Sequence, residues 1–341
     1  MIYQSDNRIT KTIFNGINAY ELNVYPYQAI ILPECGGNLI AFRDVENNYS
    51  FLREPADNQM DDFKENPFLY GIPVLFPPNR IENGRFSFLN HTYKFPINEP
   101  VNKNHLHGFF YNHCWEVSET TSSEMESTIE LSLKIDKQSD IYRYFPHSFR
   151  MSLRYTLSEN ELVQNVTILN EGKESMPLML GFHTSINAPF SKNSTMEDYN
   201  LQLSIKEKIE LNERSLPTGK RLDLKSTEKK LSTEGNSPFF QQLDHHYAAQ
   251  KDQPNRMVLT DKREKISLIY ETGSKYPFWM LYNRDAKSGF FCPEPQTNMV
   301  NGPNVPIPLE QTGIIELKSG EFWSAHSRFY TIKHKLRNRR A

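Results

Sequence analysis

Apolar and polar residues alternate along much of the chain with a period of two. The clearest runs are residues 129–135 and 151–157, in which every second side chain is aliphatic or aromatic. Because successive side chains of a strand point to opposite faces of a sheet, this period predicts strands with one buried face. Similar runs predict further strands in residues 18–32, 37–43, 86–95, 162–168, 264–270, 277–282 and 321–332.

Turn-forming residues separate these runs, as at Gly36-Gly37, and no long segment carries the 3.6-residue period of an amphipathic helix. Residues 58–66 are the best candidate for a short helix. Many short strands joined by turns are typical of sandwiches and barrels, whereas parallel sheets need long crossovers. The pattern therefore predicts an all-β fold, either a large antiparallel β-sandwich or a barrel.

Residues 205–236 are rich in lysine, glutamate, serine and threonine, a composition that could mark a linker. Alternation resumes beyond this segment without a new composition. We therefore interpret 205–236 as a polar surface excursion within a single domain that spans residues 1–341.

The composition argues against several classes of partner. Charged residues make up 23% of the 341 positions and the formal net charge is −2, so nothing points to nucleic acid. No signal-like segment opens the sequence and no stretch approaches a membrane span, which predicts a cytoplasmic protein. Cys35, Cys114 and Cys292 are widely spaced, which favours reduced thiols over a disulfide framework. Both a monomer and a homodimer are compatible with the sequence.

Residues 104–116, NHLHGFFYNHCWE, concentrate three histidines, a cysteine and a glutamate. His105 and His107 lie two positions apart, on one side of an extended chain, so a metal site is one interpretation. Proton transfer by one of the histidines is the other. Glu116 lies nine positions after His107, too far for the metal-binding pattern of a cupin, which disfavours the metal site.

Three further stretches carry candidate chemistry. In GIPVLFPPNRIENGRF two prolines fix a loop that presents Asn79 and Arg80; the guanidinium could bind a ligand or form a surface ion pair. His183 follows an apolar strand in MPLMLGFHTSINAPF, where a satisfied core histidine is the alternative to a catalyst. Glu294 stands between two prolines in FFCPEPQTNMVNGPN, which suits a positioned base and also a rigid turn.

Taken in order, these four stretches resemble the aldose 1-epimerase family, the galactose mutarotases. The family has an NRI…G.F segment, an LHG…W segment, a G.H segment and an EP.T segment, and the chain keeps this order. Shorter echoes at FPHSF, LNERSLPTG, LDHHY and LKSGE extend the resemblance over almost the whole chain. The resemblance implies a β-sandwich of the supersandwich type. It also implies an isomerase that interconverts the α and β anomers of a free hexose without a metal or other cofactor.

The resemblance also implies roles for single residues. Arg80 and Asn79 match the family's sugar-binding pair, and His107 matches its first active-site histidine. His183 matches the general acid and Glu294 the general base. The chemistry is consistent with this pair, because ring opening needs one base for the anomeric hydroxyl and one acid for the ring oxygen.

The substrate is left open by the sequence. Asp244, in the LDHHY echo, matches an aspartate that binds sugar hydroxyls, whereas Phe109 stands where many relatives have a second glycine and could reshape the pocket. One alternative function is a non-catalytic carbohydrate-binding protein on the same fold. Another is a hexose-6-phosphate 1-epimerase, although the cations that a phosphate requires do not cluster beside the four stretches.

Overall fold

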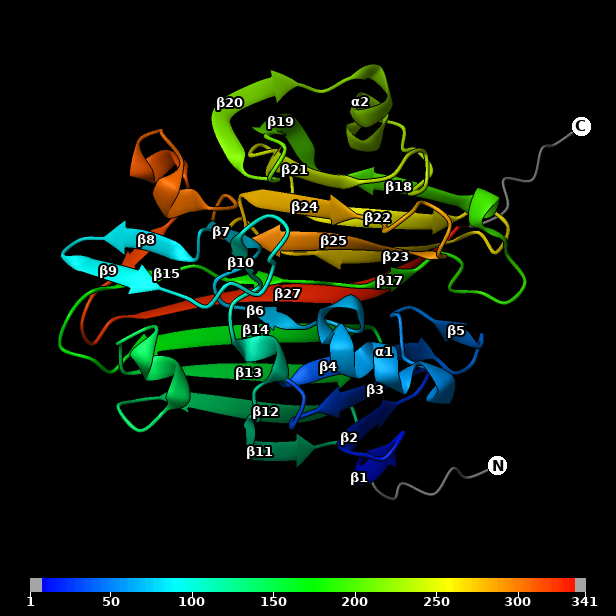
Figure 1. The fold of residues 1–341 in the computed structure, drawn as a ribbon. Helices are drawn as coiled ribbons and strands as arrows, with labels where there is room; N and C mark the ends of the chain where they lie inside the picture. Colours follow the sequence, from blue (N-terminus) through cyan, green and yellow to red (C-terminus); the bar gives the residue numbers. More distant parts are fainter. Residues whose placement is uncertain (1–7, 335–341) are drawn as a thin grey trace, which may run out of the picture.

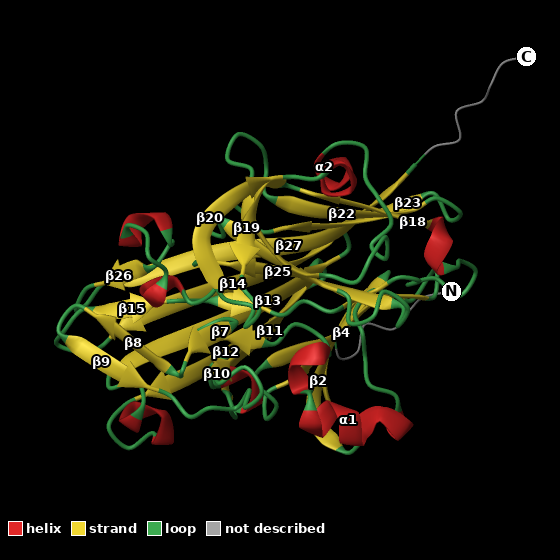
Figure 2. Ribbon diagram, turned by 45° about the horizontal axis from the view of Figure 1, so that its top comes forward, coloured by secondary structure: helices red, strands yellow, loops and turns green. Residues whose placement is uncertain are grey.

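The structure is a computed structural model that describes residues 8–334, so seven residues at each end of the expected domain lie outside the described part. Strands dominate it, and the helices are short and peripheral (Figures 1 and 2). Neighbouring strands in its sheets run antiparallel. The prediction of an all-β antiparallel sandwich is confirmed.

One layer of the sandwich is an eight-stranded sheet built from long alternating strands. In β13 (Phe149–Ser158) the odd-numbered side chains are buried and the even-numbered ones are more exposed, which confirms the run predicted at 151–157. The strand order is β11 (Glu116–Ser122), β12 (Glu126–Ile135), β13, β14 (Glu161–Asn170), β27 (Phe322–Lys333), β23 (Ile266–Glu271), β22 (Arg256–Asp261) and β18 (Tyr199–Leu203).

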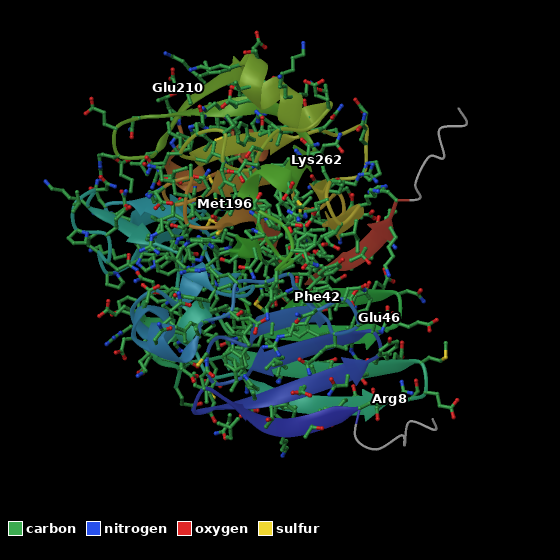
Figure 3. The ribbon with its side chains drawn as sticks, turned by 90° about the vertical axis from the view of Figure 1, so that its right-hand side faces the viewer. Arg8, Phe42, Glu46, Met196, Glu210 and Lys262 are labelled. Atoms are coloured by element: carbon green, nitrogen blue, oxygen red, sulfur yellow. The ribbon has the colours of Figure 1, made fainter. Side chains whose placement is uncertain are left out.

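A five-stranded sheet near the N-terminus packs on this layer through buried aromatic side chains. The rings of Phe42 and Phe329 lie 6.2 Å apart between the two sheets. Figure 3 shows Phe42 inside the molecule and Glu46, at the end of the same hairpin, at the surface. The sheet consists of β1 (Ile9–Phe14), β2 (Ile17–Val24), β3 (Tyr27–Leu32), β4 (Asn38–Asp44) and β5 (Tyr49–Ser50).

A second eight-stranded sheet faces the same layer, as the 6.2 Å contact between the rings of Tyr270 and Trp279 shows. Its order is β20 (Pro217–Asp223), β19 (Ile205–Leu211), β21 (Asp244–Ala249), β24 (Phe278–Tyr282), β25 (Phe290–Gln296), β16 (Gly181–Phe182) and β6 (Val74–Leu75), with β17 (Ile186–Asn187) also paired to β25.

The polar segment 205–236 contributes two strands to one edge of this second sheet, β19 and β20, and helix α2 (Ser226–Ser232). The helix expected at 58–66 is α1 (Met60–Glu65), flanked by the 3-10 helices η1 (Asp57–Gln59) and η2 (Pro67–Leu69). Among the residues described, no helix has both the length and the apolar character needed to cross a membrane.

Short strands and 3-10 turns complete the fold. The strands pair as β7 (Arg80–Glu82) with β10 (Asn104–Leu106), β8 (Arg85–Phe88) with β9 (His91–Lys94), and β15 (Met176–Leu178) with β26 (Ile315–Leu317). The remaining 3-10 turns are η3 (Phe110–Asn112), η4 (Asp140–Arg143), η5 (Met196–Asp198), η6 (Gly302–Asn304) and η7 (Leu309–Gln311).

Candidate functional site

Strand register brings the G.H and EP.T segments together. β16 and β17 pair with β25 in one antiparallel alignment, because Gly181 lies opposite Gln296 and Ile186 lies opposite Phe291. The same alignment places His183 opposite Glu294. Their side chains meet, with His183 Nε2 3.2 Å from Glu294 Oε1 and side-chain exposures of 4% and 2%. Two residues separated by more than a hundred positions therefore form one buried imidazole–carboxyl pair.

Arg80 reaches the same region from the first residue of β7. Its Nε donates to Glu99 Oε1 at 3.0 Å, and one terminal nitrogen lies 3.4 Å from Asp244 Oδ2 at the start of β21. The side chain of Arg80 is only 12% exposed. Arg80 does form the ion pairs that were the alternative to ligand binding, but its guanidinium is largely buried rather than exposed at the surface. Glu99, which sequence reasoning did not single out, sets the direction of the guanidinium.

Asn79 and His107 lie beside each other, and both have an unusual backbone conformation. Both adopt positive φ, 55° and 65°, in a region that non-glycine residues seldom occupy. The His107 N–H donates to the Asn79 carbonyl at 2.9 Å, and the Asn79 side-chain oxygen accepts from the backbone N–H of Arg80. Gly108 follows with φ of 67°, and a Cβ at that position would lie 2.0 Å from the carbonyl oxygen of Phe76. This contact explains the glycine of the LHG segment.

These residues line a cavity of about 310 Å³. All six residues singled out from the sequence contribute to its wall. Sequence reasoning missed the others, which carry no local signal of function. They come from the link between α1 and η2, from η2, β10 and β24, and from the turn after β24: Asn66, Phe68, Leu69, Leu106, Tyr282 and Arg284.

Phe68 has the closest relation to the candidate chemistry among these additional residues. Its ring centroid lies 4.9 Å from that of His107 and 5.7 Å from that of His183. The two imidazoles are themselves 5.2 Å apart, edge to face. Phe68 therefore shields both histidines on the side of α1 and lowers the local polarity of the cavity wall.

Burial disfavours charge on the two histidines. Burial, aided by the smaller effect of the Arg53 charge, lowers the pKa of His183 to about 3. Burial, His183 and Arg80 hold the pKa of His107 well below its ordinary value. Both imidazoles are therefore neutral near pH 7 when the cavity holds no charged group.

The pKa of Glu294 is shifted upward, because burial disfavours the charged form of a carboxyl as well. Burial raises the pKa of its carboxyl well above the usual range, and the negative charge of Asp244 raises it further, against the opposing effects of Arg80 and Gln296. Strongly perturbed titratable groups in a cavity are typical of functional sites. The His183–Glu294 pair can hold one proton, and a ligand that changes the local charge can move that proton from the carboxyl to the imidazole.

Each of the three titratable groups in the cavity wall has a polar atom without a partner. Glu294 Oε2, His183 Nδ1 and His107 Nδ1 have no hydrogen-bond partner among the described residues. Buried polar atoms without partners are uncommon in folded proteins and need an explanation. A ligand with several hydroxyls would supply partners for such atoms.

The structure separates the histidines of residues 104–116. His105 Nδ1 donates to the Pro96 carbonyl at 2.7 Å and its ring packs on Phe95, whereas His107 lies against Phe68. Across residues 8–334, no group of three or more His, Cys, Asp or Glu side chains is arranged to hold a metal ion. The hypothesis of a metal site in this stretch thus finds no support in the arrangement of the side chains.

Phe109 does not line the cavity. Its ring stacks on Tyr144, with centroids 5.4 Å apart and planes 5° from parallel, and meets Phe95 edge to face. The expectation that its bulk could reshape the pocket directly is therefore not met, because the ring packs on Tyr144 and Phe95 instead of facing the cavity.

The fold and the cavity define an antiparallel β-sandwich protein with a buried imidazole–carboxyl pair beside an arginine–carboxylate cluster. The aldose 1-epimerase family model matches residues 26–330, and the chain belongs to that family. The family resemblance expected from the order of the motifs is confirmed.

A solved galactose mutarotase-like protein from Clostridium acetobutylicum is 30% identical to the chain, with a TM-score of 0.92 over 96% of this chain and 98% of that one. A galactose 1-epimerase from Lactobacillus acidophilus is 19% identical, with a TM-score of 0.71 over 96% and 98% of the two chains, and shows the shared fold alone. The uncharacterised protein YihR of Escherichia coli K12 is 27% identical over 173 residues. That match covers 49% of this chain and 53%, about half, of the length of YihR.

Proposed function

We propose that the chain is an aldose 1-epimerase, a mutarotase that interconverts the α and β anomers of a free hexose. The observation that carries the proposal is the contact between His183 Nε2 and Glu294 Oε1, 3.2 Å apart and buried in the wall of the cavity. Membership of the aldose 1-epimerase family supports the reaction class.

In the proposed mechanism the pair acts first with its proton on His183. The Glu294 carboxylate takes the proton of the anomeric hydroxyl while the His183 imidazolium gives its proton to the ring oxygen. The bond between C1 and the ring oxygen breaks, and the sugar becomes an open-chain aldehyde. The pair is then left as a neutral carboxylic acid and a neutral imidazole, the forms that burial favours at both residues.

Rotation about the C1–C2 bond presents the other face of the aldehyde to the hydroxyl that becomes the ring oxygen. Glu294 then returns its proton to the carbonyl oxygen while His183 takes the proton of the attacking hydroxyl. The ring closes as the other anomer and the pair regains its starting protonation. Every proton moves between sugar and protein, so the proposed cycle consumes no co-reactant and runs equally in both directions.

The polar groups around the pair have positioning roles in this proposal. Arg80, whose direction is fixed by Glu99 and Asp244, can donate to sugar oxygens on which charge develops. Asp244 has a side chain that is 39% exposed and can accept from sugar hydroxyls. His107, with a free Nδ1 in the cavity wall, is a further hydroxyl partner, and Asn79 fixes its backbone.

Polarimetry tests the proposal. Freshly dissolved α-glucose and α-galactose change rotation slowly in water, and the protein should accelerate the change for at least one of them. Prolonged incubation with a chelator should leave that rate unchanged, because the proposed cycle uses only protons. Tight sugar binding without any acceleration would favour the carbohydrate-binding alternative.

A hexose 6-phosphate is the second candidate substrate, and one observation favours it. Arg284 lines the cavity from the turn after β24, is exposed, and its guanidinium makes no hydrogen bond or ion pair within the described part of the chain. A free guanidinium can bind a phosphate through two parallel hydrogen bonds. Arg284→Gln should lower kcat/KM for the phosphorylated sugar alone if this candidate is correct.

A further inference from the structure

Gln296, the last residue of β25, has an unusual environment. Its side chain is fully buried, yet neither the amide nitrogen nor the amide oxygen has a hydrogen-bond partner among the described residues. A buried amide without partners costs free energy that an apolar side chain of the same size would not. The residue does not line the cavity, so direct contact with a ligand does not explain it.

The register of β25 places this amide next to the proposed base. Residues two apart on a strand project from the same face, so Gln296 and Glu294 point the same way. Glu294 Oε2, the oxygen that does not face His183, also lacks a partner among the described residues. Two neighbouring side chains on one strand thus leave a donor and an acceptor unused.

The absence of a side chain at Gly181 leaves room for the side chain of Gln296. It lies directly opposite Gln296 in the β16–β25 pair, and a Cβ on Gly181 would come 3.1 Å from Gln296 Cγ and 2.8 Å from Pro78 Cβ. The glycine of the G.H segment therefore leaves room for the glutamine side chain on the face of β16. The same pairing that aligns His183 with Glu294 also packs Gln296 beneath them.

We propose that Gln296 is a positioning residue that donates a hydrogen bond from its amide to Glu294 Oε2 when Glu294 is ionised. The inference rests on the proposed role of Glu294 as the base. The donation stabilises the arrangement in which the shared proton sits on His183, which is the arrangement that opens the ring. In the open-chain stage Glu294 is protonated and this hydrogen bond weakens, so Gln296 helps to return the proton on closure.

The electrostatics agree with this role. Burial and Asp244 raise the pKa of Glu294, and the Gln296 amide is one of the groups that lower it. The other titratable groups that face or influence Glu294 come from several elements around it: His183, Arg80, Asp244, Tyr282 and Cys292. None of these changes when Gln296 is substituted, so a shift in the pKa of Glu294 in a Gln296 variant isolates the amide.

The test uses Gln296→Met, which keeps the length of the side chain and removes the amide. Gln164→Met is the matched control, because Gln164 is also buried but lies on β14 and donates to Tyr155. Gln296→Met should lower kcat roughly tenfold to a hundredfold, the range for a hydrogen bond to a charged group, with little change in KM. Its thermal midpoint should equal or exceed that of wild type, because two unpartnered polar atoms are removed.

Gln164→Met should show the reverse, with normal kcat and a lower midpoint, because a used hydrogen bond is lost. The pKa of Glu294, followed by carboxyl ¹³C NMR and assigned with Glu294→Gln, should rise in Gln296→Met. The alkaline limb of its rate profile should move to higher pH by the same amount. A merely structural glutamine would produce neither shift.

An unchanged Glu294 pKa, or a kcat within twofold of wild type, would overturn the positioning role. If Gln296→Met does not fold, Gln296→Asn serves with the same criteria, since its shorter side chain withdraws the amide from the carboxyl. The NMR titration does not depend on any sugar. If the Glu294 pKa differs between wild type and Gln296→Met but the wild type does not accelerate mutarotation, the proposed function is refuted. The hydrogen bond between Gln296 and Glu294 is then still supported.

Discussion

The pKa values of two buried glutamates, one on the second eight-stranded sheet and one on a helix beside it, are shifted in opposite directions. Glu294 on β25 and Glu228 on α2 have side chains only 2% and 1% exposed, and each lies beside a histidine. Burial raises the pKa of Glu228 too, but hydrogen bonds from His245, Lys208 and the backbone of Lys225 outweigh it and hold the pKa well below its usual range. At Glu294 the effect of burial is larger than that of the groups that oppose it, so the pKa is raised.

The difference lies in the number of donors. Glu228 Oε1 accepts from Lys208 at 2.8 Å and from Tyr247 at 3.0 Å, and Oε2 accepts from the backbone N–H of Lys225 at 3.1 Å. Glu294 has one histidine and a free oxygen. A carboxylate whose lone pairs are filled fastens α2 to β19 and β21, whereas one left underbonded in a cavity wall is ready to exchange a proton.

Replacing each glutamate by glutamine should give the largest effects, on activity at Glu294 and on stability at Glu228. Glu294→Gln keeps the shape of the side chain but cannot accept a proton, so kcat should fall by about 10²–10⁴ while sugar affinity changes far less. Its thermal midpoint should stay level or rise, since a carboxyl with too few donors is removed. Polarimetry and thermal unfolding measure the two effects. Full activity in this variant would remove Glu294 from the mechanism and leave it as a structural residue of β25.

Glu228→Gln should show the opposite pair of effects. Removing the charge leaves the Lys208 ammonium without its buried counter-ion, so the free energy of unfolding should fall by about 3 kcal/mol. The kcat of the folded fraction should match wild type, since Glu228 does not line the cavity. Urea unfolding monitored by fluorescence gives the free energy. A variant as stable as wild type would show that the cluster around Glu228 is dispensable.

The pH dependence of stability should differ in sign between the two sites. The folded pKa of Glu228 is lowered, so its contribution is complete above the unfolded value of about 4.3 and is lost as pH falls through the folded pKa. The folded pKa of Glu294 is raised, so its contribution is complete below about 4.3 and is lost as pH rises through the folded pKa.

Urea unfolding at a series of pH values checks these signs. The deficit of Glu228→Gln relative to wild type should shrink on acidification below about pH 4, and the advantage of Glu294→Gln should grow on alkalinisation. Parallel curves for the two variants would mean that donor number does not distinguish the sites.

Arg80→Lys should give the smallest of these effects. The lysine keeps the charge but loses the planar fork that lies between Glu99 and Asp244, so KM should rise about tenfold, the size of one charge-assisted hydrogen bond. The fold should be retained, as circular dichroism would report. An unchanged KM would remove Arg80 from sugar binding and leave it as a structural ion pair.

The sequence predicted the sandwich well because its strands carry a strict period of two, as β13 shows, and because motif order identified the family. It also singled out six residues that the structure brings to one cavity. Their catalytic and binding roles stay predictions. The family resemblance made it possible to expect that the six residues lie together. The alignment of Gly181 with Gln296, which sets His183 opposite Glu294, is visible only in the pairing of β16 and β25.

Other features could not be predicted, since they depend on contacts between distant segments. Phe68 sits in a short 3-10 turn whose sequence shows no periodicity, and its importance lies in the two imidazoles that it meets. Glu99 and Glu228 look like ordinary surface acids in the sequence. The polar composition of 205–236 concealed the strands β19 and β20 and a buried carboxylate on α2.

A double-mutant cycle on His183 and Glu294 tests whether the two side chains exchange protons with the sugar as one unit. Mutarotation rates are measured by polarimetry for wild type, His183→Asn, Glu294→Gln and the double variant. Each single variant should lose most of the activity, and the double variant should be little slower than the poorer single. Losses that multiply in the double variant would show that the two residues act independently and would contradict the shared-proton mechanism.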